Sequence, residues 1–140
     1  MVLENMLTGY EYRFVFSLLL SLIGGYLIGS ERESRGKDAG ISTQSLVIGG
    51  AMLFTFISLA MDPDSPARIA AQVVTGVGFL GAGIILKSKK GHVANLTTAA
   101  SIWFSAAIGM AIGFGWYAIA VIGIVYAVLV PRVPRVKGKK

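Results

Sequence analysis

The sequence contains no cysteine and few charged residues. Only 14% of its 140 residues are Asp, Glu, Lys or Arg, whereas 54% are hydrophobic. A soluble domain usually carries about 25% charged residues, so a globule of this composition would have too little polar surface to cover it. The absence of cysteine excludes a disulfide framework, a thiolate nucleophile and a cysteine-based metal site.

Charged residues are missing altogether from four long stretches, at residues 14–30, 40–61, 69–86 and 93–131. A membrane-spanning helix needs about 20 mostly apolar residues. The last stretch has 39 residues, which suits two helices separated at Gly113 and Gly115, where a tight turn is favoured. We therefore predict an all-α, polytopic transmembrane helix bundle in one domain, with no soluble domain and about five spans, at residues about 13–30, 41–61, 67–86, 94–113 and 116–131.

Lysine and arginine are unevenly distributed among the segments that connect these spans. If the N-terminus lies outside, the first and third loops and the C-terminal tail are cytoplasmic, and they hold 11 of the 13 basic residues. Cytoplasmic segments of membrane proteins carry such an excess. We therefore predict an outside N-terminus and a cytoplasmic C-terminus. The first span lacks a basic flank and a small-residue cleavage site, so we expect it to be retained rather than removed as a signal peptide.

A glycine pattern in the third predicted span, Gly76-x-Gly78-x-x-Gly81, matches the fingerprint of a dinucleotide-binding loop. That loop must join a strand to a helix and be followed, about 20 residues later, by an acidic residue. No Asp or Glu follows Asp64 in this chain, so the match is fortuitous. Glycines in a membrane helix instead allow neighbouring backbones to approach closely.

Two further rows of small residues recur every four positions, and we interpret both as packing surfaces, within the chain or between copies. Four glycines at positions 76 to 83 weaken a helix, so a local break or bend in the third span is the open alternative. The first row lies in the first span and the second in the fourth: Ser17, Ser21, Gly25 and Gly29; Thr97, Ser101, Ser105, Gly109 and Gly113.

A few polar residues lie within or at the ends of the predicted spans. Glu31 and Arg32 end the first span, Gln72 lies inside the third, and Asn95, Thr97 and Thr98 open the fourth. Such groups mark functional sites because their burial requires a partner. The alternative is that Glu31 and Arg32 pair with neighbouring loop charges, and that Arg68 extends its side chain to the membrane interface.

No set of residues resembles a catalytic site. His92 is the single histidine and has no second ligand at metal-binding spacing. The basic residues border the spans and do not line one folded face, which disfavours nucleic-acid binding. We therefore predict no enzymatic activity, no cofactor, no metal site and no nucleic-acid partner.

Three segments carry a resemblance to a known family: "GSERESRGKDAGIST", "SPARIAAQVVTGVGFLGAGIIL" and "LTTAASIWFSAAIGMAIGFG". They resemble the MgtC/SapB family of bacterial and archaeal membrane proteins over residues 17–130. The departures are Ser42 and Gln44, where the family usually has Arg and His, Asn95 in place of a usual Gly, and Thr97, where the member that gives the family its name has Asn. The chain is similar to a short form that lacks the family's C-terminal ACT-like domain. The resemblance assigns three signatures: Gly29, Glu31, Arg32, Gly36, Lys37, Ala39, Gly40 and Thr43; Arg68, Gln72, Gly76, Gly78, Phe79, Gly81, Ala82 and Gly83; and Leu96, Thr97, Thr98 and Ala99.

The resemblance implies a multi-pass protein of a bacterial or archaeal cell membrane that is linked to growth in low magnesium. Family members act largely on other membrane proteins, such as P-type cation ATPases and the ATP synthase. Our first hypothesis is therefore a regulator or adaptor that acts through helix–helix contacts in the lipid bilayer.

The second hypothesis is an oligomeric transporter or channel for Mg²⁺ or another small solute. Glu31, Gln72, Asn95 and Thr98 would line its path, and a bundle of this size would need a homodimer or larger assembly to enclose one. A polar cavity near Gln72 would favour transport. Dry packing of the glycine face against a neighbouring helix would favour the adaptor.

Overall fold

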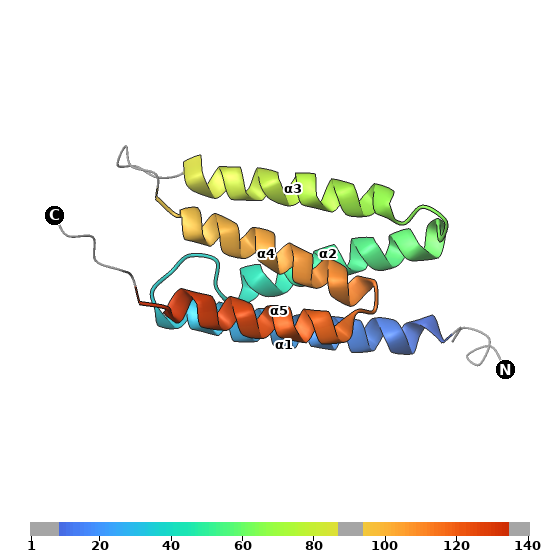
Figure 1. The fold of residues 1–140 in the computed structure, drawn as a ribbon, viewed down its shortest axis with the longest axis horizontal. Coiled ribbons are helices and arrows are strands. Elements are labelled where there is room, and N and C mark those ends of the chain that lie inside the picture. Colours follow the sequence, from blue (N-terminus) through green and yellow to red (C-terminus); the bar gives the residue numbers. More distant parts are fainter. Residues whose placement is uncertain (1–8, 87–93, 135–140) are drawn as a thin grey trace.

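The computed structural model describes residues 9–86 and 94–134, which form five α-helices joined by short connections. The helices lie side by side along the long axis of the molecule (Figure 1). The predicted all-α bundle is confirmed, since the described residues include no strand. The elements are α1 (Tyr10–Ser34), α2 (Ile41–Met61), α3 (Ala67–Leu86), α4 (Leu96–Gly113), α5 (Tyr117–Leu129) and the short 3₁₀ helix η1 (Val130–Arg132).

Four of these helices, α1 to α4, are long and apolar enough to cross a membrane. The fifth, α5, has 13 residues, which at 1.5 Å per residue gives about 20 Å against a hydrocarbon thickness of about 30 Å. A helix is therefore present at the fifth predicted position, but it is shorter than the bilayer core. α4 ends at Gly113, and Gly115 takes a φ of 81° in the turn before α5. α3 continues without a break through its glycines.

Successive helices run in opposite directions, so the bundle has two distinct ends (Figure 1). The C-terminal ends of α1, α3 and α5 meet the N-terminal ends of α2 and α4 at one end. The segments 1–8, 87–93 and 135–140 lie outside the described residues. His92 and several of the basic residues used to predict the topology belong to them.

Helix α2 is the centre of the bundle, and the small residues of α1 and α4 pack against it. A Cβ atom on Gly25 of α1 would lie 2.3 Å from the Cα of Ser45, and one on Gly29 would lie 2.3 Å from the Cα of Ile41. On the α4 side, a Cβ on Gly109 would lie 2.2 Å from the carbonyl oxygen of Ile48. Only glycine permits these approaches, because real Cβ atoms do not come within 3 Å of such atoms.

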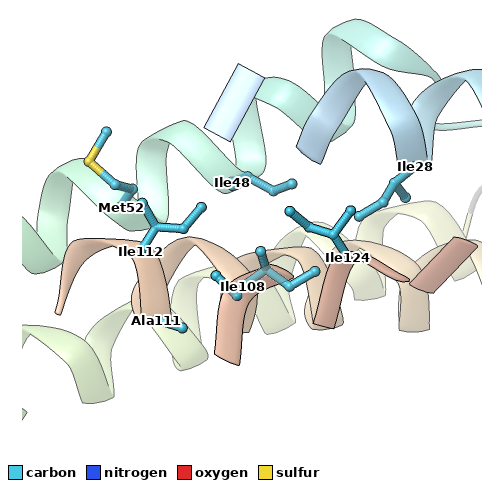
Figure 2. Close-up of a cluster of buried hydrophobic side chains, with 8 residues drawn as sticks. Ile28, Ile48, Met52, Ile108, Ala111, Ile112 and Ile124 are labelled. Carbon is cyan, nitrogen blue, oxygen red and sulfur yellow. The ribbon is translucent and has the colours of Figure 1, made fainter. Parts of the chain in front are cut away.

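The main core lies between α1, α2, α4 and α5. Its isoleucines come from all four helices and lie close together in Figure 2. Among the side chains that the structure describes in α3, none joins this cluster and the buried ones are Ala70 and Val73, of which Val73 joins a smaller cluster with Ala51 and Ala106. α3 is thus the peripheral helix of the bundle. The main core consists of Ile28, Ile48, Met52, Ile108, Ala111, Ile112, Ala120 and Ile124.

Candidate functional site

The loop after α1 begins with a glycine-terminated helix end. Gly36 has a φ of 61°, its N–H donates to the carbonyl of Glu33 at 2.9 Å, and the N–H of Lys37 donates to the carbonyl of Arg32 at 3.0 Å. These two hydrogen bonds form a Schellman motif, which satisfies carbonyls that the end of a helix leaves without partners. The backbone of the first signature therefore turns sharply back toward α2.

Glu33 fixes the start of α2 across this turn. Its carboxylate oxygen Oε1 accepts a hydrogen bond from the backbone N–H of Ile41 at 2.8 Å, one of the N–H groups that a helix start leaves without a partner. Gly40 lies directly beside that carboxylate, and a Cβ there would come within 2.1 Å of Oε1. A negative group is also favourable at a helix N-terminus.

Arg32 is the centre of a polar cluster at this end of the bundle. Its side chain is buried, with the residue only 2% exposed. Its Nε and Nη2 groups donate to the carbonyl oxygen of Asp38 at 3.1 and 3.0 Å, and Nη2 also donates to the hydroxyl of Thr98 on α4. One guanidinium therefore connects α1, the α1–α2 loop and α4, which uses the fixed fork of donors that arginine provides.

Gln44 forms the second half of the cluster and is fully buried on α2. Its amide nitrogen donates to the carbonyl of Ala39 at 3.2 Å and to the hydroxyl of Ser101 at 3.1 Å. Its amide oxygen accepts from the hydroxyl of Ser105 at 2.6 Å. Because Ser101 also donates to the carbonyl of Thr98 at 2.9 Å, the two halves of the cluster meet on α4.

Glu31 and Arg35 form an ion pair at the rim of the cluster. The Nη1 group of Arg35 lies 3.0 Å from the carboxylate of Glu31, whose side chain is 3% exposed. The same Nη1 donates to the carbonyl of Pro131 in η1. The neighbouring loop charge predicted for Glu31 is thus Arg35, whereas Arg32 is held by a carbonyl and a hydroxyl.

The remaining signature residues do not join the polar cluster. Lys37, Arg68, Thr97 and Phe79 are exposed, and Asn95 takes a left-handed φ of 64° just before α4. Gly81 faces Ala99 of α4, with a Cβ position 3.6 Å from the Ala99 side chain. The other glycines of the second signature face open space, since a Cβ on each would meet no atom within 4 Å: Gly76, Gly78 and Gly83.

A groove of about 610 Å³ runs between α2 and α3. Gly50 and Gly76 lie along it, and Thr43 and Gln72 are its polar side chains. The other lining residues are apolar: Leu46, Val47, Ala51, Phe54, Ile69, Val73, Val77 and Leu80.

The predicted path residues do not lie together. Gln72 lies near the start of α3 and Arg32 near the end of α1, and these two helix ends lie at opposite ends of the bundle (Figure 1). Glu31 and Thr98 belong to the polar cluster, whereas Gln72 belongs to the groove. In the described part of the chain, no three His, Cys, Asp or Glu side chains are grouped as metal ligands.

Gln44, Ser101 and Ser105 belong to the cluster but were not predicted as site residues. Gln44 stood out only as a departure from the family pattern, although an amide within an uncharged run of 22 residues, 40–61, requires a partner in a membrane. This need for a hydrogen-bond partner could have identified Gln44 as a site residue from the sequence. The two serines were assigned to a packing row, which gave no indication of hydrogen bonds to α2.

The family model for the MgtC family matches residues 18–137 of this chain. Protein MgtC of Salmonella typhimurium strain LT2 is 45% identical over 106 residues, covering 76% of this chain and 46% of that protein. "Putative magnesium transporter YhiD" of Escherichia coli K12 is 46% identical over 129 residues, covering 86% of this chain and 60% of that protein. Protein MgtC of Brucella abortus is 46% identical over 110 residues, covering 78% of this chain and 45% of that protein. The chain thus spans about half the length of the curated relatives it matches, and no solved structure matches it.

Proposed function

The chain belongs to the MgtC family, and from this premise we propose that it regulates cation homeostasis in a cell membrane by docking against other membrane proteins. The condition it serves is magnesium limitation. The observation that carries this proposal is the open groove between α2 and α3. Its size, its apolar lining and the glycines along it suit the side chains of a transmembrane helix from another protein.

The polar cluster supports a scaffolding role for the first and third signatures. Arg32 is buried and donates from Nε and Nη2, and Gln44 is buried and uses both its amide nitrogen and its amide oxygen, so these groups are already occupied within the protein. Hydrogen bonds in a buried network rigidify the elements they join. The cluster therefore holds α1, α2 and α4 in the arrangement that leaves one wall of the groove on α2.

The partner that fits this groove is an apolar helix of an integral membrane protein. The family resemblance points to a P-type cation ATPase or the ATP synthase as the protein that supplies it. Association of helices in lipid depends on close packing of small residues, because lipid tails are as apolar as the side chains. Filling the groove should therefore abolish docking even when the side chain that fills it is itself apolar.

Gly50 and Gly49 offer a matched test of this expectation. Both are neighbours on α2 with no atom within 4 Å of a Cβ position, but only Gly50 lines the groove. We expect Gly50→Leu to abolish rescue of growth at low Mg²⁺ in a strain that lacks its own MgtC relative, whereas Gly49→Leu retains rescue. A photo-crosslinker placed at Phe54 should capture the ATPase or ATP synthase only when position 50 is Gly. Full rescue by Gly50→Leu would contradict docking in the groove.

Transport is the second candidate, favoured by the name of the E. coli relative, "Putative magnesium transporter YhiD". The test is Mg²⁺ flux into proteoliposomes that contain purified wild type, Glu31→Ala or Gln72→Ala. The regulator proposal predicts no saturable flux from folded, inserted protein. Saturable flux that either substitution abolishes would replace it with transport.

A further inference from the structure

One side of α3, distinct from its contacts with α4, is uncovered along its length. Gln72, Gly76, Phe79 and Gly83 follow one another at spacings of four, three and four residues, which places them on one face of a helix. We call this the outer face of α3. All four residues are exposed, Phe79 to 79%, and a Cβ on either glycine would meet no atom within 4 Å.

The outer face carries an amide without a partner. Among the described residues, the Gln72 side chain has no hydrogen bond. Its position, the sixth residue of α3, lies about 7.5 Å from the start of the helix at 1.5 Å per residue. A primary amide that faces hydrocarbon loses the hydrogen bonds it makes in water, which is unfavourable unless another group replaces them.

The same face combines a projection with two hollows. The ring of Phe79 projects between Gly76 and Gly83, which lie about one helical turn to either side of it. A surface that carries both a projecting ring and glycine hollows is complementary to a copy of itself. The amide of Gln72 has the same property, because its NH₂ group donates and its oxygen accepts, so two such amides can hydrogen-bond reciprocally.

We infer that a second copy of this chain binds the outer face of α3, forming a parallel, two-fold symmetric pair in which Gln72 contacts Gln72 of the partner subunit. A two-fold contact places the same patch of both copies face to face. Parallel copies hold Gln72 at equal depth in the membrane, whereas antiparallel copies would place it near Gly81, which has no polar side chain. The partner's α3 would then border the α2–α3 groove, because Gln72 and Gly76 belong to both surfaces.

This pairing is connected to the proposed function only because both use residues that line the groove. It is therefore tested separately, with purified protein. The chain has no cysteine, so single cysteines report proximity cleanly. We expect oxidation in liposomes to crosslink Thr75→Cys, beside the outer face, and Gly83→Cys, on it. Leu19→Cys on α1 and Ile122→Cys on α5, both exposed at 54% and 69%, should remain monomeric. Equal crosslinking at all four positions would overturn the inference.

Substitutions at two glycines of α3 can be compared by their effect on the dissociation constant of the dimer. Gly76 and Gly78 are both exposed with open space at the Cβ position, but their separation of two residues places them on different sides of the helix. Gly76→Ile should weaken dimerisation in lipid, measured by energy transfer between labelled copies, by roughly tenfold or more, because the branched side chain separates the two backbones. Gly78→Ile has the same cost in helix propensity and should leave the dissociation constant unchanged.

Removing the amide tests the hydrogen bonds themselves. Gln72→Leu should raise the dimer dissociation constant about 3- to 30-fold, the range that interhelical hydrogen bonds in membranes produce. Wild-type protein that is monomeric in liposomes, or equal effects of Gly76→Ile and Gly78→Ile, would overturn the pairing. If wild type is monomeric in liposomes, the second copy is excluded, and docking of another protein in the groove is then judged by the Gly50→Leu and Phe54 experiments alone.

Discussion

At the scale of single residues, the contact between Arg32 and Thr98 can be tested with an isosteric substitution. Thr98→Val removes the hydroxyl that accepts from the buried guanidinium and should lower the free energy of unfolding by about 1–3 kcal/mol, as expected for a buried hydrogen bond to a charged group. Thr97 is the matched control, because it is the preceding residue but is exposed. Thr97→Val should change stability by no more than about 0.5 kcal/mol. Reversible unfolding in mixed micelles measures both.

A double-mutant cycle tests whether the stability lost in Thr98→Val comes from its hydrogen bond with Arg32. Arg32→Gln and Thr98→Val should together cost less than the sum of the two single changes, with a coupling of about 0.5–3 kcal/mol. Additive effects would show that Thr98 stabilises the protein through packing alone.

Gly36 allows backbone conformation to be tested without steric interference. It has a φ of 61°, and a Cβ there would meet no atom within 4 Å. Gly36→Ala should therefore destabilise the protein only through the left-handed backbone, by about 1–2 kcal/mol. The Gly36→Asn variant should recover part of that loss, because Asn tolerates this conformation. An unchanged unfolding free energy for Gly36→Ala would show that the turn relaxes.

At the scale of helices, the same substitution should have opposite effects at a glycine in the contact between α1 and α2 and at a glycine beside open space. A Cβ on Gly25 would lie 2.3 Å from Ser45, whereas one on Gly49 would meet nothing. Gly25→Ala should cost about 1–3 kcal/mol through overpacking, and Gly49→Ala should stabilise by up to about 1 kcal/mol through helix propensity. The two substitutions are chemically identical, so a difference in unfolding free energy reports packing. Equal effects would contradict the close approach of α1 and α2.

The helices themselves were predictable because α1, α2 and α3 each coincide with an uncharged run, and the turn between α4 and α5 falls at Gly113 and Gly115. α1 differs most from its predicted span, since it extends beyond residues 13–30 at both ends and includes charged residues there. How the helices pack against one another could not be predicted from the sequence. Arg32 and Thr98 are 66 residues apart, and no local pattern indicates that they touch. The glycines of α3 were visible in the sequence, but their periodicity does not state which of them face α4 and which face lipid. That distinction depends on how α3 packs, which the sequence pattern leaves open.

At the scale of the whole molecule, the alternating directions of the helices make orientation in the membrane testable with two cysteines. Lys37 and Asp64 are both exposed and lie in loops at opposite ends of the bundle (Figure 1). The loop with Lys37 belongs to the segments that hold 11 of the 13 basic residues, so we expect it in the cytoplasm. In intact cells, an impermeant maleimide should label Asp64→Cys, and it should label Lys37→Cys only after permeabilisation.

The cysteine-free wild type provides the background for this labelling, and the outcome also bears on the pairing of two copies. A reversed pattern would contradict the predicted orientation but leave all copies parallel, so Gln72 could still contact Gln72 of the partner subunit. Strong labelling of both positions in intact cells would mean that copies insert in both directions. The depth of Gln72 in the membrane would then differ between oppositely inserted copies, since it lies nearer one end of α3 than the other. Only copies with the same orientation could form the parallel pair, so the number of such pairs would fall to about half or less. One labelling experiment therefore tests the charge distribution of the loops and the geometry that the outer face of α3 requires.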